Sequence, residues 1–201
     1  MTDDEWMVEA LALAARGLGA TAPNPMVGAV VVRGGRAIGR GFHARAGTRH
    51  AEVVALDEAG PAARGSTLYC TLEPCAHTGR TGPCVERILR EGVRRIVVAV
   101  EDPDPRVDGA GIRTLRAQGV EVVVGVGRQA ACRLNEAFFT VKRKRRPFVT
   151  LKAAVSLDGG IAAAPGRCTP LTGAAAQAHA HRVRTEVDAI GVGSEIGRAH
   201  V

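Results

Sequence analysis

The stretch TLYCTLEPCAHTGRTGPC, residues 67–84, joins a short apolar segment to two Pro-Cys pairs. Residues 66–72 alternate and are rich in apolar side chains, as in a buried strand. Pro83 favours a helix start, because a proline at the first helical position has no N–H to lose. The stretch therefore predicts a strand, a loop that carries Cys75, and a helix that begins near Cys84.

Strands and helices alternate on both sides of this stretch, and Thr2 and Glu5 form a capping box before the first helix. This alternation predicts an α/β fold, and continuous apolar strands indicate a sheet covered on both faces. We expect helices over 6–15, 50–59, 83–92, 109–118 and 128–140, and strands over 27–32, 37–42, 66–72, 96–100 and 120–124.

A second domain is expected after the basic run at residues 142–146. The sequence predicts a strand, a turn, a helix and a last strand there, which are too few elements to enclose a core. These elements fall at 148–155, 158–160, 174–184 and 189–192, so we divide the chain into domains at 1–145 and 146–195.

His50 and Glu52 stand at the start of the expected second helix and complete a metal-binding pattern with Cys75 and Cys84. Zinc binds imidazole and thiolate in a tetrahedron, and three protein ligands leave the fourth position for water. Bound zinc lowers the pKa of that water toward about 7. His-x-Glu followed by two cysteines, the first after proline, is typical of zinc nucleobase deaminases, in which the glutamate moves protons and is not a ligand.

The alternative is a structural zinc site, which needs a fourth protein ligand. His43 and His77 are the candidates for that ligand. The positions of the cysteines favour metal binding in either case, because a helix N-terminus stabilises a thiolate. Cys70 alternates in phase with the apolar residues of its strand and is expected in the core.

Composition excludes several classes of protein. No apolar run approaches the length of a membrane span, and the acidic N-terminus lacks the basic start of a signal peptide, so we expect a cytoplasmic protein. Five cysteines, an odd number, argue against a disulfide framework. Removing the five charges of 142–146 from the net charge of +7 leaves +2, and 3% aromatic residues disfavour a nucleic-acid-binding surface.

The sequence resembles the bifunctional riboflavin biosynthesis enzymes, in which a pyrimidine deaminase is fused to a reductase. Eight residues separate the two cysteines, whereas cytidine and tRNA-editing deaminases usually have two. Among enzymes, the alternative is a tRNA or free-nucleoside deaminase. Among proteins that are not enzymes, the alternative is a nucleic-acid-binding zinc module. The resemblance is carried by PNPMVG (23–28), HAE (50–52), TLEPC (71–75), HTGRTGPC (77–84), DPDP (102–105), RPFVTLK (146–152) and SLDG (156–159).

The resemblance implies a cytidine-deaminase-like three-layer sandwich with a central, mostly parallel sheet, followed by the first part of a dihydrofolate-reductase-like domain that uses NADPH. The implied substrate is a diaminopyrimidinone with a ribosylamino 5-phosphate, and a homo-oligomer is left open. The implied substrate contacts are Asn24, His43, His77, Arg80 and Asp102, and the implied reductase residues are Lys152, Ser156, Asp158, Thr172 and Arg184.

The last six residues, IGRAHV (196–201), can be encoded by ATC GGA AGA GCA CAC GTC, which is part of a common short-read sequencing adapter. We therefore expect 196–201 to be a non-native tail and the reductase to be truncated and inactive. A natural truncation with a coincidental tail is the alternative.

Overall fold

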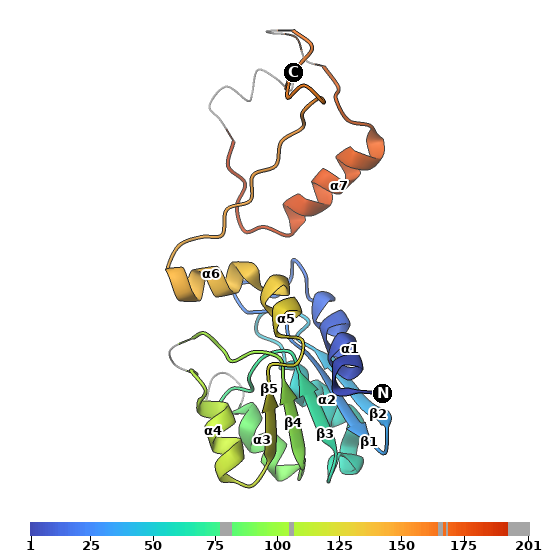
Figure 1. Cartoon of the computed structure of the whole chain (residues 1–201), viewed down its shortest axis with the longest axis vertical. Coiled ribbons are helices and arrows are strands. Elements are labelled where there is room, and N and C mark those ends of the chain that lie inside the picture. The colour runs from blue at the N-terminus through green and yellow to red at the C-terminus, as the bar shows by residue number, and fades with distance from the viewer. Residues whose placement is uncertain (77–81, 105–106, 165–166, 168, 193–201) are drawn as a thin grey trace. The chain divides into compact units, whose positions relative to one another are not determined.

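The computed structural model of the chain describes residues 1–76, 82–104, 107–164, 167 and 169–192. The chain separates into two compact units, Met1–Phe148 and Val149–Val201 (Figure 1). The expected tail, 196–201, lies outside the described residues. None of the helices in the described ranges is long and apolar enough to cross a lipid bilayer.

The first unit is built on a five-stranded sheet with the order β2-β1-β3-β4-β5. β1 pairs antiparallel with both β2 and β3, while β3, β4 and β5 pair in parallel. Four strands therefore run in one direction and only β1 opposes them, which confirms a mostly parallel sheet. The bounds are Gly28–Arg33 (β1), Arg36–Phe42 (β2), Thr67–Cys70 (β3), Arg95–Val98 (β4) and Glu121–Val124 (β5).

Helices cover both faces of this sheet, as Figure 1 shows. Side chains alternate along each strand, so that Val31 and Leu68 join a core with α2, α3 and α4, while Val30 and Tyr69 join a core with α1, α5 and α6. The three-layer prediction is confirmed. The helices are α1 (Asp3–Ala15), α2 (Ala51–Ala59), α3 (Cys84–Arg90), α4 (Ala110–Ala117), α5 (Arg128–Leu134) and α6 (Glu136–Lys144), with a short 3-10 helix, η1 (Gly60–Ala63).

The prediction of one helix over 128–140 is wrong, because the helix is broken at Asn135 into α5 and α6. The buried Asn135 side chain accepts a hydrogen bond from the Met26 N–H at 2.8 Å and donates one to the Met26 carbonyl at 2.8 Å. This contact joins the helix junction to the loop before β1. A smaller correction concerns Pro83, which caps α3 from outside instead of occupying its first turn.

The second unit contains α7 (Ala174–Thr185), which matches the expected helix, and the expected turn, where the Gly159 N–H bonds the Ser156 carbonyl at 3.0 Å. The expected strands over 148–155 and 189–192 are absent from the structure, which describes both segments. A strand needs a neighbour for its N–H and C=O groups. None of the described residues of this unit supplies one, and Leu151 is 92% exposed.

An ion-pair network fixes the N-terminus of α1 to the sheet. The Asp3 carboxylate accepts hydrogen bonds from both terminal nitrogens of Arg95, at 2.9 and 2.8 Å, and from the Tyr69 hydroxyl at 2.7 Å. The Arg95 hydrogen bonds, opposed by partial burial, lower the pKa of Asp3 from 3.8 to about 2.

We expect this network to make stability pH-dependent. Because the pKa of Asp3 is lowered by folding, its contribution is complete above pH 3.8 and is lost as the pH falls through about 2. The side chain is 32% exposed, so solvent screening reduces the contribution to about 1 kcal/mol. Urea unfolding of Asp3→Asn and wild type should differ by this amount at pH 6 and converge near pH 2. The exposed Asp4→Asn should show no such convergence, and a constant difference for Asp3→Asn would contradict the assignment.

Candidate active site

The first donor side chain, His50, caps the N-terminus of α2. Two glycines of β2 allow α2 to lie directly against that strand. A Cβ atom on Gly41 would lie 2.2 Å from the Ala51 carbonyl oxygen, and one on Gly39 would lie 2.1 Å from the Ala55 carbonyl oxygen. The sequence of β2 therefore sets how closely the helix that carries His50 and Glu52 approaches the sheet.

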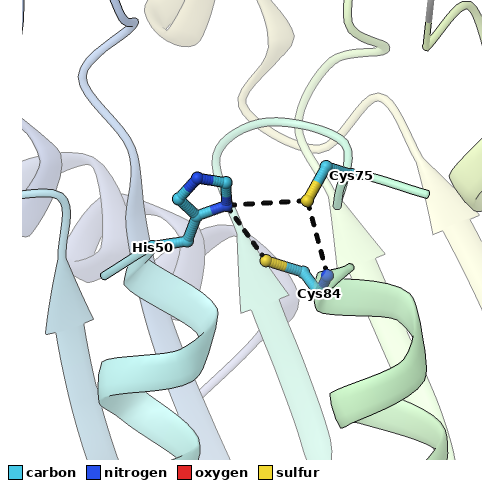
Figure 2. A group of neighbouring side chains, drawn as sticks. All are labelled: His50, Cys75 and Cys84. Carbon is cyan, nitrogen blue, oxygen red and sulfur yellow. Dashed lines mark hydrogen bonds between the residues drawn. The ribbon is translucent and has the colours of Figure 1, made fainter. Parts of the chain in front are cut away.

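Cys75 follows β3, Cys84 is the first residue of α3, and both side chains point toward His50 (Figure 2). His50 Nδ1 lies 3.1 Å from Cys84 Sγ and 3.6 Å from Cys75 Sγ. The Cys84 N–H also donates to Cys75 Sγ at 3.4 Å. Ligand atoms of a tetrahedral zinc site, each about 2.0–2.3 Å from the metal, lie roughly 3.5–3.8 Å apart. The 3.6 Å separation lies in this range and the 3.1 Å separation just below it, so the three residues fit the coordination of a zinc ion after a small outward shift of Cys84.

Protonation of the three side chains is consistent with a metal-binding role. A hydrogen bond from Cys84 and the nearby His50 lower the pKa of Cys75 to about 4, against the effect of burial. The hydrogen bond with the Cys75 sulfur in turn raises the pKa of His50 to about 8. The contact between the Cys75 and Cys84 side chains, together with burial, raises the pKa of Cys84. The lowered pKa of Cys75 and the raised pKa of Cys84 favour a thiolate at Cys75 beside a thiol that keeps its proton at Cys84. A divalent cation can replace that proton and the one on the imidazole, which leaves the thiolate and neutral imidazole donors that zinc prefers.

Glu52 lies in the first turn of α2 and is only 3% exposed. Burial raises the pKa of its carboxyl group, and the charge of His50 opposes that shift. A carboxyl group with a raised pKa holds and releases protons nearer to neutral pH, which suits general acid–base catalysis. Glu52 is not one of the three donors that converge on the metal position among the described residues.

Asn24 and His43 are brought together beside the donor group. His43 Nδ1 faces the Arg49 carbonyl oxygen at 3.2 Å, which can only accept, so Nδ1 carries the hydrogen. Nε2 then accepts from the Asn24 side-chain amide at 3.2 Å. Burial lowers the pKa of His43, and its ring lies edge-on to that of His50, with centroids 5.8 Å apart. Both ring nitrogens have partners, so His43 does not act as a fourth zinc ligand here.

Comparison with known proteins agrees with this site. A family model described as "Cytidine and deoxycytidylate deaminase zinc-binding region" matches residues 1–100, and "RibD C-terminal domain" matches residues 147–200. Riboflavin biosynthesis protein RibD of Aquifex aeolicus is 49% identical over 191 residues, which cover 95% of this chain and 54% of that protein. The chain belongs to the RibD family. It spans about half the length of the curated relatives that it matches.

Solved RibD structures show the same fold. Acinetobacter baumannii RibD, form 1, has a TM-score of 0.87 and 46% identity, over 91% of this chain and 51% of that one. The diaminohydroxyphosphoribosylaminopyrimidine deaminase/5-amino-6-(5-phosphoribosylamino)uracil reductase of Thermotoga maritima has a TM-score of 0.85 and 42% identity, over 90% and 52%. The likeness to RibD proteins therefore extends across most of this chain.

Asp102, a predicted substrate contact of the RibD resemblance, lies in the loop after β4 and is half-buried. Burial raises the pKa of its carboxyl group, and one carboxylate oxygen accepts the Asp104 N–H at 2.8 Å. No direct contact between Asp102 and the three donor residues occurs among the described residues. His77 and Arg80, the other two predicted contacts, lie outside the described residues.

The predicted reductase residues are not gathered into one site by the described part of the second unit. Ser156 and Asp158 meet in the turn, where the Ser156 hydroxyl donates to Asp158. Thr172 is half-buried, and its carbonyl accepts a hydrogen bond from a glutamine in the first turn of α7. Arg184 contacts a histidine on the same helix, and Lys152 is exposed. The NADPH-related assignments therefore remain predictions.

Proposed function

We propose that this chain catalyses the hydrolytic deamination of a phosphoribosylated diaminopyrimidinone in riboflavin biosynthesis, with residues 1–145 as the deaminase domain. The observation that carries the proposal is the convergence of His50, Cys75 and Cys84 beside the buried Glu52. Three donors leave room for water in a tetrahedral site, which is the catalytic arrangement. RibD relatives at 49% and 45% identity support the pathway.

His50, Cys75 and Cys84 would hold a zinc ion, which would supply a Lewis acid that makes water a nucleophile near neutral pH. Glu52 takes the proton released as water attacks the ring carbon that bears the amino group. It then delivers that proton to the departing ammonia. The burial of Glu52 favours this role, because bulk solvent does not compete with its carboxylate for the proton.

Asn24, His43 and Asp102 are proposed to bind the pyrimidine ring and ribose. The Asn24–His43 hydrogen bond fixes the orientation of both side chains beside His50. The loop that carries Asn24 is held in turn by the contact of Asn135 with Met26. These contacts support a preorganised site, in which the side chains lose little conformational entropy when the substrate binds.

Arg80 and His77 are proposed to bind the 5-phosphate, because a guanidinium presents a planar pair of donors to phosphate oxygens. We expect Arg80→Ala to raise the KM for the phosphorylated substrate about tenfold or more, since a hydrogen bond to a charged group contributes about 1.5–3 kcal/mol. The same change should hardly affect the KM for the dephosphorylated nucleoside. Steady-state kinetics on both compounds measures this difference. Equal effects on both would contradict phosphate binding.

Residues 146–195 are proposed to be the start of a reductase domain that uses NADPH in the complete family enzymes. The family model that matches residues 147–200 supports this division. The proposed residues are Lys152, Ser156, Asp158, Thr172 and Arg184, each carried over from the RibD resemblance.

A small phosphorylated pyrimidine, and not a nucleic acid, is the proposed binding partner. The basic run is partly engaged within the fold. Lys142 forms an ion pair with Asp104 at 2.7 Å, and the Arg143 guanidinium lies 4.7 Å from the centre of the Phe139 ring. A cytoplasmic location is part of the same proposal, and homo-oligomerisation is compatible with it.

Ammonia release by the zinc-loaded protein tests the proposal against its enzymatic alternative. We expect turnover of the phosphoribosylated diaminopyrimidinone and none above background with cytidine or tRNA. Preferred turnover of cytidine or tRNA would replace the proposal with the nucleoside or tRNA deaminase. No deamination, combined with a steep salt dependence of RNA affinity, would favour the nucleic-acid-binding zinc module.

A further inference from the structure

Glu73 is a buried carboxylate, 4% exposed, that lies two residues before the metal ligand Cys75. It accepts four backbone N–H groups from a segment about 30 to 40 residues further along the chain. One carboxylate oxygen accepts from Asp102 at 3.1 Å and Gly109 at 3.0 Å. The other accepts from Gly111 at 2.9 Å and Ile112 at 3.2 Å.

Two of these donors belong to the first turn of α4, where backbone N–H groups have no partner within the helix. Its N-cap residue, Gly109, has no side chain to supply a hydrogen bond. Glu73 therefore caps α4 from another segment, and its negative charge is favoured by the positive end of the helix dipole.

The backbone is shaped to allow this contact. A Cβ atom on Gly111 would lie 2.1 Å from the Pro74 carbonyl oxygen, so only glycine permits α4 to approach the segment of Glu73 and Pro74 this closely. Asp108, just before the helix, has a φ of 35°, which is unfavourable for a residue with a side chain. Such a conformation persists only where the surroundings fix it, and the hydrogen bond from Gly109 to Glu73 does so.

We propose that Glu73 is a positioning residue that fixes Asp102 relative to Cys75 and thereby the pyrimidine ring relative to the metal site. The inference rests on the proposed function, because Asp102 matters only if it contacts substrate. Glu73 shares a short segment with Cys75 and holds the N–H of Asp102 directly. The ion pair of Lys142 with Asp104 holds the same loop from α6.

The test is Glu73→Gln, which keeps the shape of the side chain but turns an NH₂ group toward two of the N–H donors. We expect zinc content to be unchanged and kcat/KM to fall about 10- to 100-fold, mainly through KM, because the loop with Asp102 shifts. If Glu73 acts through Asp102, the same change should cost little in an Asp102→Ala background. Gly111→Ala, which displaces α4 by another route, should also raise KM with zinc retained.

Asp3→Asn is the matched control, because Asp3 also accepts several hydrogen bonds but contacts Tyr69 and Arg95 instead of the loop. Its effect on kcat/KM should be the same with and without Asp102. Equal, additive effects of Glu73→Gln in both backgrounds, or loss of zinc from Glu73→Gln, would overturn the inference.

Amide hydrogen exchange separates failure of this inference from failure of the proposed function. Exchange at Asp102 and Gly109 should be slow in the wild type and faster in Glu73→Gln, whichever substrate the protein uses. Unchanged exchange overturns the positioning role. A wild type that does not deaminate the pyrimidine overturns the proposed function, and with it the assigned purpose of the contact.

Discussion

Glu52→Gln is expected to keep one zinc per chain and to lose deamination by about 10²–10⁴-fold or more. The amide has nearly the shape of the carboxyl group but cannot carry a proton between water and ammonia. The loss should be at the upper end of this range, because one residue serves both proton transfers. Zinc content by elemental analysis and single-turnover rates of ammonia release give the two required measurements.

Glu58→Gln is the matched control for this experiment. Glu58 lies on the same helix, α2, but is exposed and accepts a hydrogen bond from the backbone of Arg40. The same chemical change should leave the rate of ammonia release near that of wild type. If Glu52→Gln retained most of the activity, the proton transfers would belong to another residue.

Cys84→Ala is expected to lose both zinc and activity, because two of the three donors do not hold the ion in a tetrahedral site. The variant should also be less stable, since zinc binds the folded state and stabilises it by about 4 kcal/mol at a free concentration of 1,000 times Kd. Thermal unfolding with and without added zinc measures this, and the zinc-dependent rise in Tm should disappear in the variant.

Cys70→Ala provides the control for loss of a buried thiol. Cys70 is fully buried, burial raises the pKa of its thiol, and it is not a member of the donor group formed by His50, Cys75 and Cys84. Cys70→Ala should therefore keep its zinc while losing some packing energy. Wild-type zinc content in Cys84→Ala would show that the ligand set is wrong.

The residues of the metal site could be predicted because their chemistry is carried by type and spacing. A cysteine at a helix start, a second cysteine after a strand and a histidine two residues before a glutamate have few other reasons to occur together, and the structure brings the donor atoms of His50, Cys75 and Cys84 within 4.8 Å of one another. The sheet could be predicted in outline, because four of its five strands, β1, β3, β4 and β5, are largely apolar. The antiparallel pairing of β1 with β2 follows from the two-residue connection between them, but the pairing of β1 with β3 could not be predicted, since it depends on which neighbour the strand meets.

Contacts between segments that lie far apart in the chain could not be predicted from the sequence. Asn135 interrupts the expected helix because its side chain binds Met26, 109 positions away, and the only local signal is the poor helix propensity of asparagine. Glu73 offered a similar signal, a carboxylate directly after the expected apolar strand, but its partners come from the loop after β4 and the first turn of α4. In the second unit, the apolar segment at 148–155 predicts a strand only if another strand pairs with it.

The most direct test of the proposed reaction is deamination of the phosphoribosylated diaminopyrimidinone in water enriched in oxygen-18. Hydrolysis places one oxygen from water on the ring carbon that loses ammonia. We therefore expect the wild-type product to carry one heavy oxygen per molecule of ammonia released, and we expect Glu52→Gln and Cys84→Ala to form little labelled product in the same time. An unlabelled product, or no product from the zinc-loaded wild type, would contradict the account.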